Sequence, residues 1–465
     1  MPGWLAWTAA GIVAVVGGLA LLVQSPPATR WGRDWLIRQV ASQWQLDLAT
    51  TRLDLDPLAR RVTLYDVRLA APGHDDDPFF SAARVSASLP WAVFRGRVRV
   101  DVLEVDGGRV HLVREGGVMV NLPPSSGKPP PEVPRRLDLR NVRVSWLDVV
   151  YEDRTADSDV SVRGLRLMLD ERQQRGVVDA AGTIAAEWLH VRLGARATTS
   201  GAWRGGAAFD GSHLALDGLT VPLPEARVVA DGHVRRVLDD THFELALTGT
   251  LDYARLSAWT PPPVPVSGTG SFTGSFTGPF NAYVLKADFA SPGLTIARAE
   301  SLSLTGHLEL TSPRTVIQPF RITMPATAVS PREGVVEGRF TYEFGASSSD
   351  MAATFRDVDL DRALAAYNED PTTFAAWQDG TVTIRVASPA ATMELHARGT
   401  SKALTRAERI AIDGTWKADL VREQWRVEHE HRLLDTVRAS GSMAWPSADE
   451  PSQSPLSGPL AVEIA

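Results

Sequence analysis

Apolar and polar residues alternate along most of the chain, and residues 299–311 show this pattern most clearly. Successive side chains of a β-strand point to opposite faces of the sheet. The apolar positions of this stretch therefore share one face: Leu302, Leu304, Leu308 and Leu310. Gly306 keeps the phase between them, and the intervening Ser, Thr, His and Glu residues occupy the other face. One apolar and one polar face predict a half-buried strand.

The same alternation recurs from about residue 46 to the end of the chain, with short turns that carry Gly, Asp and Asn. Few helical patterns interrupt it. Strands this regular, without helices between them, predict an antiparallel all-β body.

Two of the predicted strands are of special interest because large apolar residues repeat on one face. Residues 268–280 place Phe272, Phe276 and Phe280 with glycines on one face, and the Ser and Thr residues from Thr269 to Thr277 on the other. Residues 97–106 alternate Val98, Val100 and Val102. These faces fit a lipid-binding surface and a dry sheet core equally well, since periodicity alone does not separate the two.

The strand at residues 97–106 also changes phase, from Val102 to Leu103 and Val105, which predicts a β-bulge. Asp106-Gly107-Gly108 follows, and this sequence predicts a hairpin turn before a return strand at Val110 and Leu112.

Residues 3–23 carry no charge and are long enough to cross the ~30 Å hydrocarbon layer as a helix. Trp4 and Trp7 lie where an interfacial aromatic belt is found. We expect residues 1–25 to be a transmembrane anchor. A cleaved signal peptide is the alternative, although no basic region precedes the segment and Val23-Gln24-Ser25 is a poor cleavage site. The cations Arg30, Arg33 and Arg38 follow the segment, which by the positive-inside rule alone favours a cytoplasmic body.

A second helix is predicted from Arg30 to about Gln45, after Pro26-Pro27. Trp31, Trp35, Val40 and Trp44 are expected on one side of it, with the arginines toward water. Such a helix could cover the end of a sheet, lie in the membrane interface, or do both.

Proline- and glycine-rich stretches and changes in composition divide the chain into four predicted segments. They are the anchor at 1–25, an N-terminal unit of helix and strands at 26–122, a Pro-rich linker at 123–134 and a repetitive β-body at 135–465. Short helices at 251–259 and 360–367 each precede a Gly-bearing strand, which indicates a repeat of about 110 residues. Pro455-Leu456-Ser457-Gly458 repeats the opening Pro265-Val266-Ser267-Gly268 of an earlier strand, so we expect another unit to begin there and the chain to be a fragment of a longer protein.

Composition narrows the classes of function. The net charge of -7 without a basic stripe argues against nucleic acid as a partner. The absence of cysteine excludes disulfides and thiolate chemistry. His429-Glu430-His431 could supply two metal ligands, but no third ligand is evident, and an exposed polar strand face is the preferred interpretation. We find no pattern for a catalytic, cofactor or metal site and expect a protein that is not an enzyme.

The order of these elements resembles the AsmA-like superfamily and, within it, the TamB (translocation and assembly module) branch. The resemblance covers nearly the whole chain and rests on loose motifs: the strands at 62–69 and 100–110, Val120-Asn121-Leu122-Pro123, and the Ser-Gly-x-Gly strand openings that follow short helices. It implies an elongated, curved antiparallel β-sheet groove (taco-like) with an N-terminal transmembrane helix and a few short helices.

The resemblance also implies a bacterial inner-membrane protein, single-pass, with its body in the periplasm and a role in phospholipid transport to the outer membrane and in outer-membrane biogenesis. The TamB branch further implies assembly of outer-membrane proteins, and thus protein secretion, with an Omp85-type partner. No C-terminal domain that would contact such a partner is recognisable. The rival interpretations are a β-sandwich array serving as a structural or adhesion scaffold and, with less support from the pattern, a carbohydrate-active β-helix enzyme, for which no paired carboxylates are found.

Overall fold

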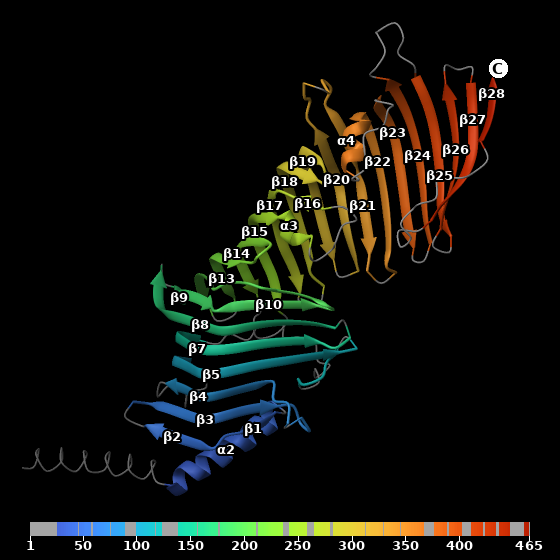
Figure 1. Cartoon of the computed structure of the whole chain (residues 1–465). Helices are drawn as coiled ribbons and strands as arrows, with labels where there is room; N and C mark the ends of the chain where they lie inside the picture. Colours follow the sequence, from blue (N-terminus) through green and yellow to red (C-terminus); the bar gives the residue numbers. More distant parts are fainter. Residues whose placement is uncertain are drawn as a thin grey trace, which may run out of the picture. The chain divides into compact units, whose positions relative to one another are not determined.

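The protein is all-β: its strands form one large, open and mainly antiparallel sheet with few helices, as the sequence predicts (Figure 1). The computed structural model describes residues 26–44, 46–56, 59–74, 76–88, 99–116, 118–122, 138–155, 157–174, 177–210, 213–235, 241–257, 265–279, 282–311, 313–328, 330–344, 346–366, 376–387, 390–401, 411–421, 424–433, 437–446 and 460–464. The predicted anchor at 1–25 and the predicted linker at 123–134 lie outside these residues, as does Phe280. Among the described helices, none combines the length and apolar character that a membrane crossing requires.

The chain divides into two compact units, Met1–Leu245 and Ala246–Ala465, and the division falls within β15 (His242–Asp252). Unit 1 begins with one helix, α2 (Pro26–Trp44). Its strands are β1 (Asp47–Ala49), β2 (Arg52–Asp56), β3 (Arg61–Ala70), β4 (Phe80–Ser88), β5 (Arg99–Glu115), β6 (Val118–Met119), β7 (Asp138–Asp153), β8 (Ser158–Gln174), β9 (Val177–Ala186), β10 (Trp188–Leu193), β11 (Arg196–Thr199), β12 (Trp203–Phe209), β13 (Leu214–Pro222) and β14 (Ala226–Arg235).

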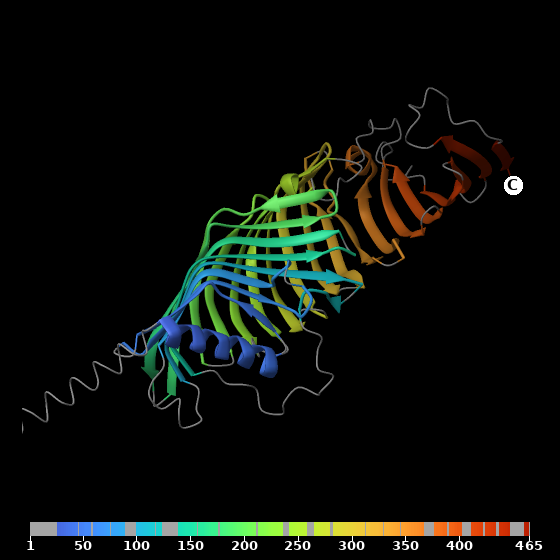
Figure 2. The same cartoon turned by 90° about the horizontal axis from the view of Figure 1, so that it is seen from below.

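Unit 2 contains two short helices, α3 (Tyr253–Leu256) and α4 (Leu360–Ala366), near the two sites predicted from sequence. Its strands are β16 (Val266–Ser267), β17 (Thr269–Pro279), β18 (Val284–Ile296), β19 (Ala299–Thr311), β20 (Arg314–Met324), β21 (Gly334–Glu343), β22 (Ser348–Asp359), β23 (Ala376–Ala387), β24 (Ala390–Ser401), β25 (Ala411–Val421), β26 (Gln424–Leu433), β27 (Val437–Pro446) and β28 (Leu460–Ile464). From β17 to β28 each strand pairs antiparallel with the next. Figure 2 shows these strands bending along their length.

One strand pair of unit 1, β5 with β7, is parallel. β5 pairs parallel with β7 over most of its length, while β3, β4, β8, β9, β12, β13 and β14 pair antiparallel with their neighbours. A parallel pair needs a connection that returns along the sheet. The described residues between these two strands, 116 and 118–122, contain the two-residue strand β6, which pairs with the end of β5. The prediction of antiparallel pairing is therefore wrong at this pair.

The predicted hairpin at Asp106-Gly107-Gly108 is also wrong, because β5 runs through these residues without turning. Val105 and Gly108 lie on the same face of the sheet, although two residues separate them instead of one. The alternation of faces along β5 therefore changes phase between Val105 and Gly108. Residues with positive φ mark the equivalent change on two nearby strands, Asp66 (52°) on β3 and Trp146 (62°) on β7, as Gly107 (60°) does on β5. The bulge predicted between Val102 and Leu103 is absent, since the register there is continuous.

Helices α3 and α4 pack against apolar side chains from the strands of unit 2. Asp252 caps α3, with its carboxylate accepting hydrogen bonds from the amides of Ala254 (3.1 Å) and Arg255 (3.3 Å). Asp359 accepts one from the amide of Asp361 (3.0 Å) at the start of α4. Together with strand residues these helices enclose a small core: Leu294, Ala299, Leu302, Met324 and Val358, with Tyr253, Ala363, Ala365 and Ala366 packed against it.

Candidate functional site

The register of unit 2 arranges its apolar side chains in rows that cross the sheet from strand to strand. Paired residues of neighbouring strands point to the same face. One row runs through Leu308: Ala287, Leu308, Ile317, Phe340, Met351, Ile384, Met393, Ala418 and Val427. The next runs through Gly306: Phe272, Phe289, Gly306, Phe320, Gly338, Ala353, Val382, Leu395, Trp416, His429 and Gly441.

We call this surface of β17–β28 the apolar face of unit 2. Its large side chains are only half-buried, Leu308, Ile317, Phe340, Met351 and Ile384 among them. All described strands belong to one sheet, so no separate second sheet is packed on these residues. The described side chains of this face are therefore in part exposed to solvent.

The opposite face of unit 2 is polar and charged, and its ions pair across neighbouring strands. Lys286 lies 3.4 Å from Glu309, Arg385 lies 3.1 Å from Asp350, and Arg321 bonds to Glu337. These pairs are exposed, and exposed pairs contribute at most about 1 kcal/mol each. Their positions show that one face of the sheet is polar and solvent-exposed along its length, while the other face is apolar.

The structure brings together most of the leucines and phenylalanines that the sequence singled out. Phe272, Phe276, Leu304, Leu308 and Leu310 all lie on the apolar face of unit 2. Leu302 shares the face but is 1% exposed, because it belongs to the core under α3 and α4. It is thus a packing residue.

The valines of β5 are placed differently. Val102 pairs with Ser88 and Asn141 and points to the face of the sheet opposite Leu103 and Val105. It therefore does not lie with the apolar residues of unit 1 that are described below. Val100 on β5 is paired with Leu139 on β7. Val98 is outside the described residues.

Sequence reasoning missed Ile317, Phe340, Met351 and Ile384 as members of the face. A signal was present: Val336, Phe340 and Tyr342, like Val382, Ile384 and Val386, alternate with polar residues. What the sequence lacks is the pairing that aligns these strands with Leu308.

Unit 1 has an apolar face of the same kind. One row consists of Leu53, Leu64, Val85, Val105, Val144, Leu167 and Ile184. Part of it is covered: helix α2 packs Leu36, Ile37 and Val40 against Leu48 and Val67 (Figure 1). The prediction that a helix covers this end of the sheet is confirmed.

The exposed side of α2 carries tryptophans. Trp31 is 66% exposed and Trp35 is 49% exposed, while Val40 is buried against the sheet. At ~100° per residue, Trp31, Trp35 and Arg38 share one side of a helix and Val40 lies on the other. The prediction that Val40 shares a side with Trp31 and Trp35 is therefore wrong. Trp44 ends the helix.

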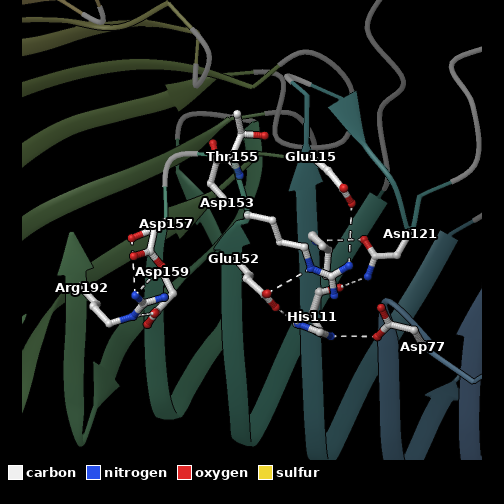
Figure 3. Close-up of polar contacts among 12 residues, drawn as sticks. Asp77, His111, Glu115, Asn121, Glu152, Asp153, Thr155, Asp157, Asp159 and Arg192 are labelled. Carbon is white, nitrogen blue, oxygen red and sulfur yellow. Dashed lines mark hydrogen bonds and ion pairs between the residues drawn. The ribbon is translucent and has the colours of Figure 1, made fainter. Parts of the chain in front are cut away.

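A polar network joins the ends of several strands in unit 1 (Figure 3). His111 on β5 lies between two carboxylates, with its Nδ1 2.9 Å from Asp77 and its Nε2 3.5 Å from Glu152. Arg154 donates to Glu152 (3.1 Å), and this bond raises the pKa of Arg154. Arg192 bonds to Asp157 and Asp159 across β10 and β8.

Asn121 joins this network through the backbone of His111 and is 0% exposed. Its Oδ1 accepts from the amide of Val113 (2.9 Å), and its Nδ2 donates to the carbonyl of His111 (2.7 Å). These bonds fasten the segment after β6 to β5. These contacts join the ends of neighbouring strands to one another.

His429 and His431 lie on the apolar face of unit 2, where they pair with Trp416 and Gly414. The prediction of an exposed polar strand face at this site is wrong for the two histidines, because the polar side of β26 is formed by the alternate residues, such as Glu428, Glu430 and Arg432. Burial, and then the nearby His429, lower the pKa of His431.

The described residues contain no cluster of three or more His, Asp or Glu side chains that could hold a metal ion. Comparisons with models of protein families, with curated proteins and with solved structures found no match to this chain.

Proposed function

We propose that the apolar faces of the sheet bind the acyl chains of phospholipids, and that the protein carries lipid between the bacterial inner membrane and the outer membrane as a non-catalytic conduit. The observation that carries this proposal is the row through Leu308. Its large side chains stay half-buried across successive strands, while the other side of each strand is charged.

The energetics favour a hydrocarbon ligand. Removal from water stabilises each CH₂ group by about 0.8 kcal/mol. A tail with about ten CH₂ groups on the face gains up to about 8 kcal/mol before the entropy of binding is subtracted. The rows offer few hydrogen-bonding groups, so a ligand without polar groups along its length fits them best.

The rival of a β-sandwich scaffold has less support. In a sandwich the apolar residues of one sheet are covered by those of another. Here the described strands belong to one sheet, and the apolar face of unit 2 keeps large side chains half-exposed.

Attachment to the inner membrane is part of the proposal, with the body in the periplasm. The uncharged segment at 3–23 supports it, as do the two exposed tryptophans of α2, which are followed by the exposed Arg38. Tryptophan and arginine side chains are typical of a helix surface at the membrane interface.

Photocrosslinking with matched positions tests the acyl-chain site. A photoreactive residue is placed at 308, 340 or 384 on the apolar face, or at the adjacent position 309, 341 or 383 of the same strand on the polar face. We expect phospholipid adducts, identified by mass spectrometry, from the first set only. A probe at the enclosed position 302 should give none. Equal lipid labelling from both faces, or none from either, would overturn the proposal.

A further inference from the structure

The apolar face of unit 2 contains one pair of titratable side chains in the rows that cross β25, β26 and β27. His429 and His431 project from β26, and their ring centroids are 5.0 Å apart. Trp416 on β25 packs edge-on against His431, with a centroid distance of 4.8 Å.

Small residues make room for the two rings. Gly414 faces His431 on β25, and a Cβ there would lie 2.9 Å from the Nδ1 atom of His431 and 2.5 Å from the ring of Trp416. On β27 the partners are Gly441 for His429 and Ala439 for His431. Gly441 and Ala439 thus leave the β27 side of both rings without a large neighbour, while Trp416 covers part of the β25 side.

The histidines lack polar partners on this face. The Nδ1 atom of His429 is buried and accepts or donates no hydrogen bond among the described residues. The charged side chains of the three strands, such as Asp413, Lys417, Glu428, Glu430, Arg432 and Arg438, belong to the alternate positions that point to the opposite face. Polar groups on an apolar surface are unfavourable unless a partner binds them.

We propose that His429 and His431 bind the anionic headgroup of an amphiphile whose tail lies on the apolar face of unit 2. This inference rests on the proposed function and adds a polar end to its ligand. A phosphodiester, the charged group of phospholipids, accepts hydrogen bonds from imidazole and is attracted more strongly by imidazolium.

The site implies a pH dependence with a definite sign. An anion beside the two rings favours their protonated forms, so binding takes up protons and becomes tighter as the pH falls. Without ligand, burial and His429 lower the pKa of His431, so this imidazole holds little charge at neutral pH. Occupancy by an anion should therefore raise the pKa of His431.

Binding measurements on the full chain test this, with probes whose own charge does not change with pH. The probes are decane sulfonate, decyl glucoside with an uncharged headgroup, and inorganic sulfate. From about pH 8 to about pH 5 we expect sulfonate affinity to rise about fivefold or more and glucoside affinity to stay constant. The rise should be lost in the double variant His429→Gln, His431→Gln. It should persist in His396→Gln, because His396 on β24 is exposed on the opposite face.

Each other outcome has a separate meaning. If the glucoside binds but sulfonate affinity does not change with pH, or changes equally in the double variant, the headgroup site is wrong and the acyl-chain proposal stands. If inorganic sulfate binds as tightly as the sulfonate, the site is one for free anions and the inference is also overturned. If neither decyl compound binds at any pH, the proposed function itself fails.

Discussion

The ring of Phe289 lies against Gly306, its partner across β18 and β19. A Cβ on Gly306 would come within 2.5 Å of the Cζ atom of Phe289. The same relation joins Phe355 on β22 and Gly380 on β23, where the distance would be 2.6 Å. Glycine thus lets an aromatic ring lie flat along the apolar face instead of standing away from it.

This relation predicts the effect of Gly306→Val. The added side chain has to displace the ring of Phe289, and overpacking of this kind costs about 1–3 kcal/mol. Urea unfolding should show a lower midpoint. Gly293→Ala on β18 is the control, because a Cβ there meets nothing within 4 Å. Equal midpoints for Gly306→Val and the wild type would show that the ring of Phe289 moves without loss.

The two sides of α2 should respond differently to truncation. Val40→Ala removes buried methyl groups from the contact with Leu48 and Val67 and should lower the free energy of unfolding by about 1–3 kcal/mol. Trp35→Ala, on the exposed side, should change it by less than about 0.5 kcal/mol. A larger loss from Trp35→Ala than from Val40→Ala would contradict the observed packing of the helix.

The exposed side of α2 can be tested for membrane contact with a single label, because the natural chain has no cysteine. Trp35→Cys carrying an environment-sensitive dye should show a blue-shifted emission when anionic vesicles are added. Thr354→Cys, at an exposed position on the polar face of β22, should show no shift. A shift at both positions, or at neither, would argue against contact through α2.

Asn121→Ala should loosen the polar network of unit 1. The substitution leaves the amide of Val113 and the carbonyl of His111 without their partner in a buried site, which costs about 1–3 kcal/mol for an unsatisfied group. Hydrogen exchange should show the amide of Val113 exchanging faster than in the wild type. Arg109→Ala, at an exposed position of the same strand, should leave this amide protected.

Acid should destabilise unit 2 through His431. Because the folded-state pKa of this histidine is lowered, the unfolded chain binds its proton more readily, and stability falls as the pH drops through the unfolded-state value of about 6.5. His431→Gln removes this contribution. The urea midpoint of the variant should therefore decline less than that of the wild type between about pH 8 and about pH 5. A parallel decline in both proteins would show that other groups set the acid sensitivity.

The β-strands were predicted correctly where apolar and polar residues alternate without interruption. Leu308 and Leu310 share a face because nothing between them breaks the alternation, and the all-β class follows from many such strands. The second helix is also present, although it begins at Pro26 and not at the predicted Arg30.

Predictions failed where two patterns overlapped. Around Val102 and Leu103 the residues fit two phases, and only the pairing with β4 and β7 decides which side faces the apolar surface. Gly107 has the positive φ that a turn would use, but it serves a phase change inside a strand. The parallel pairing of β5 and β7 depends on the path of the chain between them, which has no local signal.

The aligned phase changes of unit 1 make its strands interdependent in length. On each of β3, β4, β5 and β7, two residues instead of one separate successive side chains of the apolar face, and these steps are aligned across the four strands. The steps are Leu64 to Val67 on β3, Ala82 to Val85 on β4, Val105 to Gly108 on β5 and Val144 to Leu147 on β7. Loss of Gly107 alone would put half of β5 out of step with both neighbours and turn its valines to water. An insertion or deletion at this row therefore has to be matched in the neighbouring strands or absorbed by a bulge, as between β7 and β8 opposite Val144 and Leu147, so neighbouring strands constrain one another's evolution.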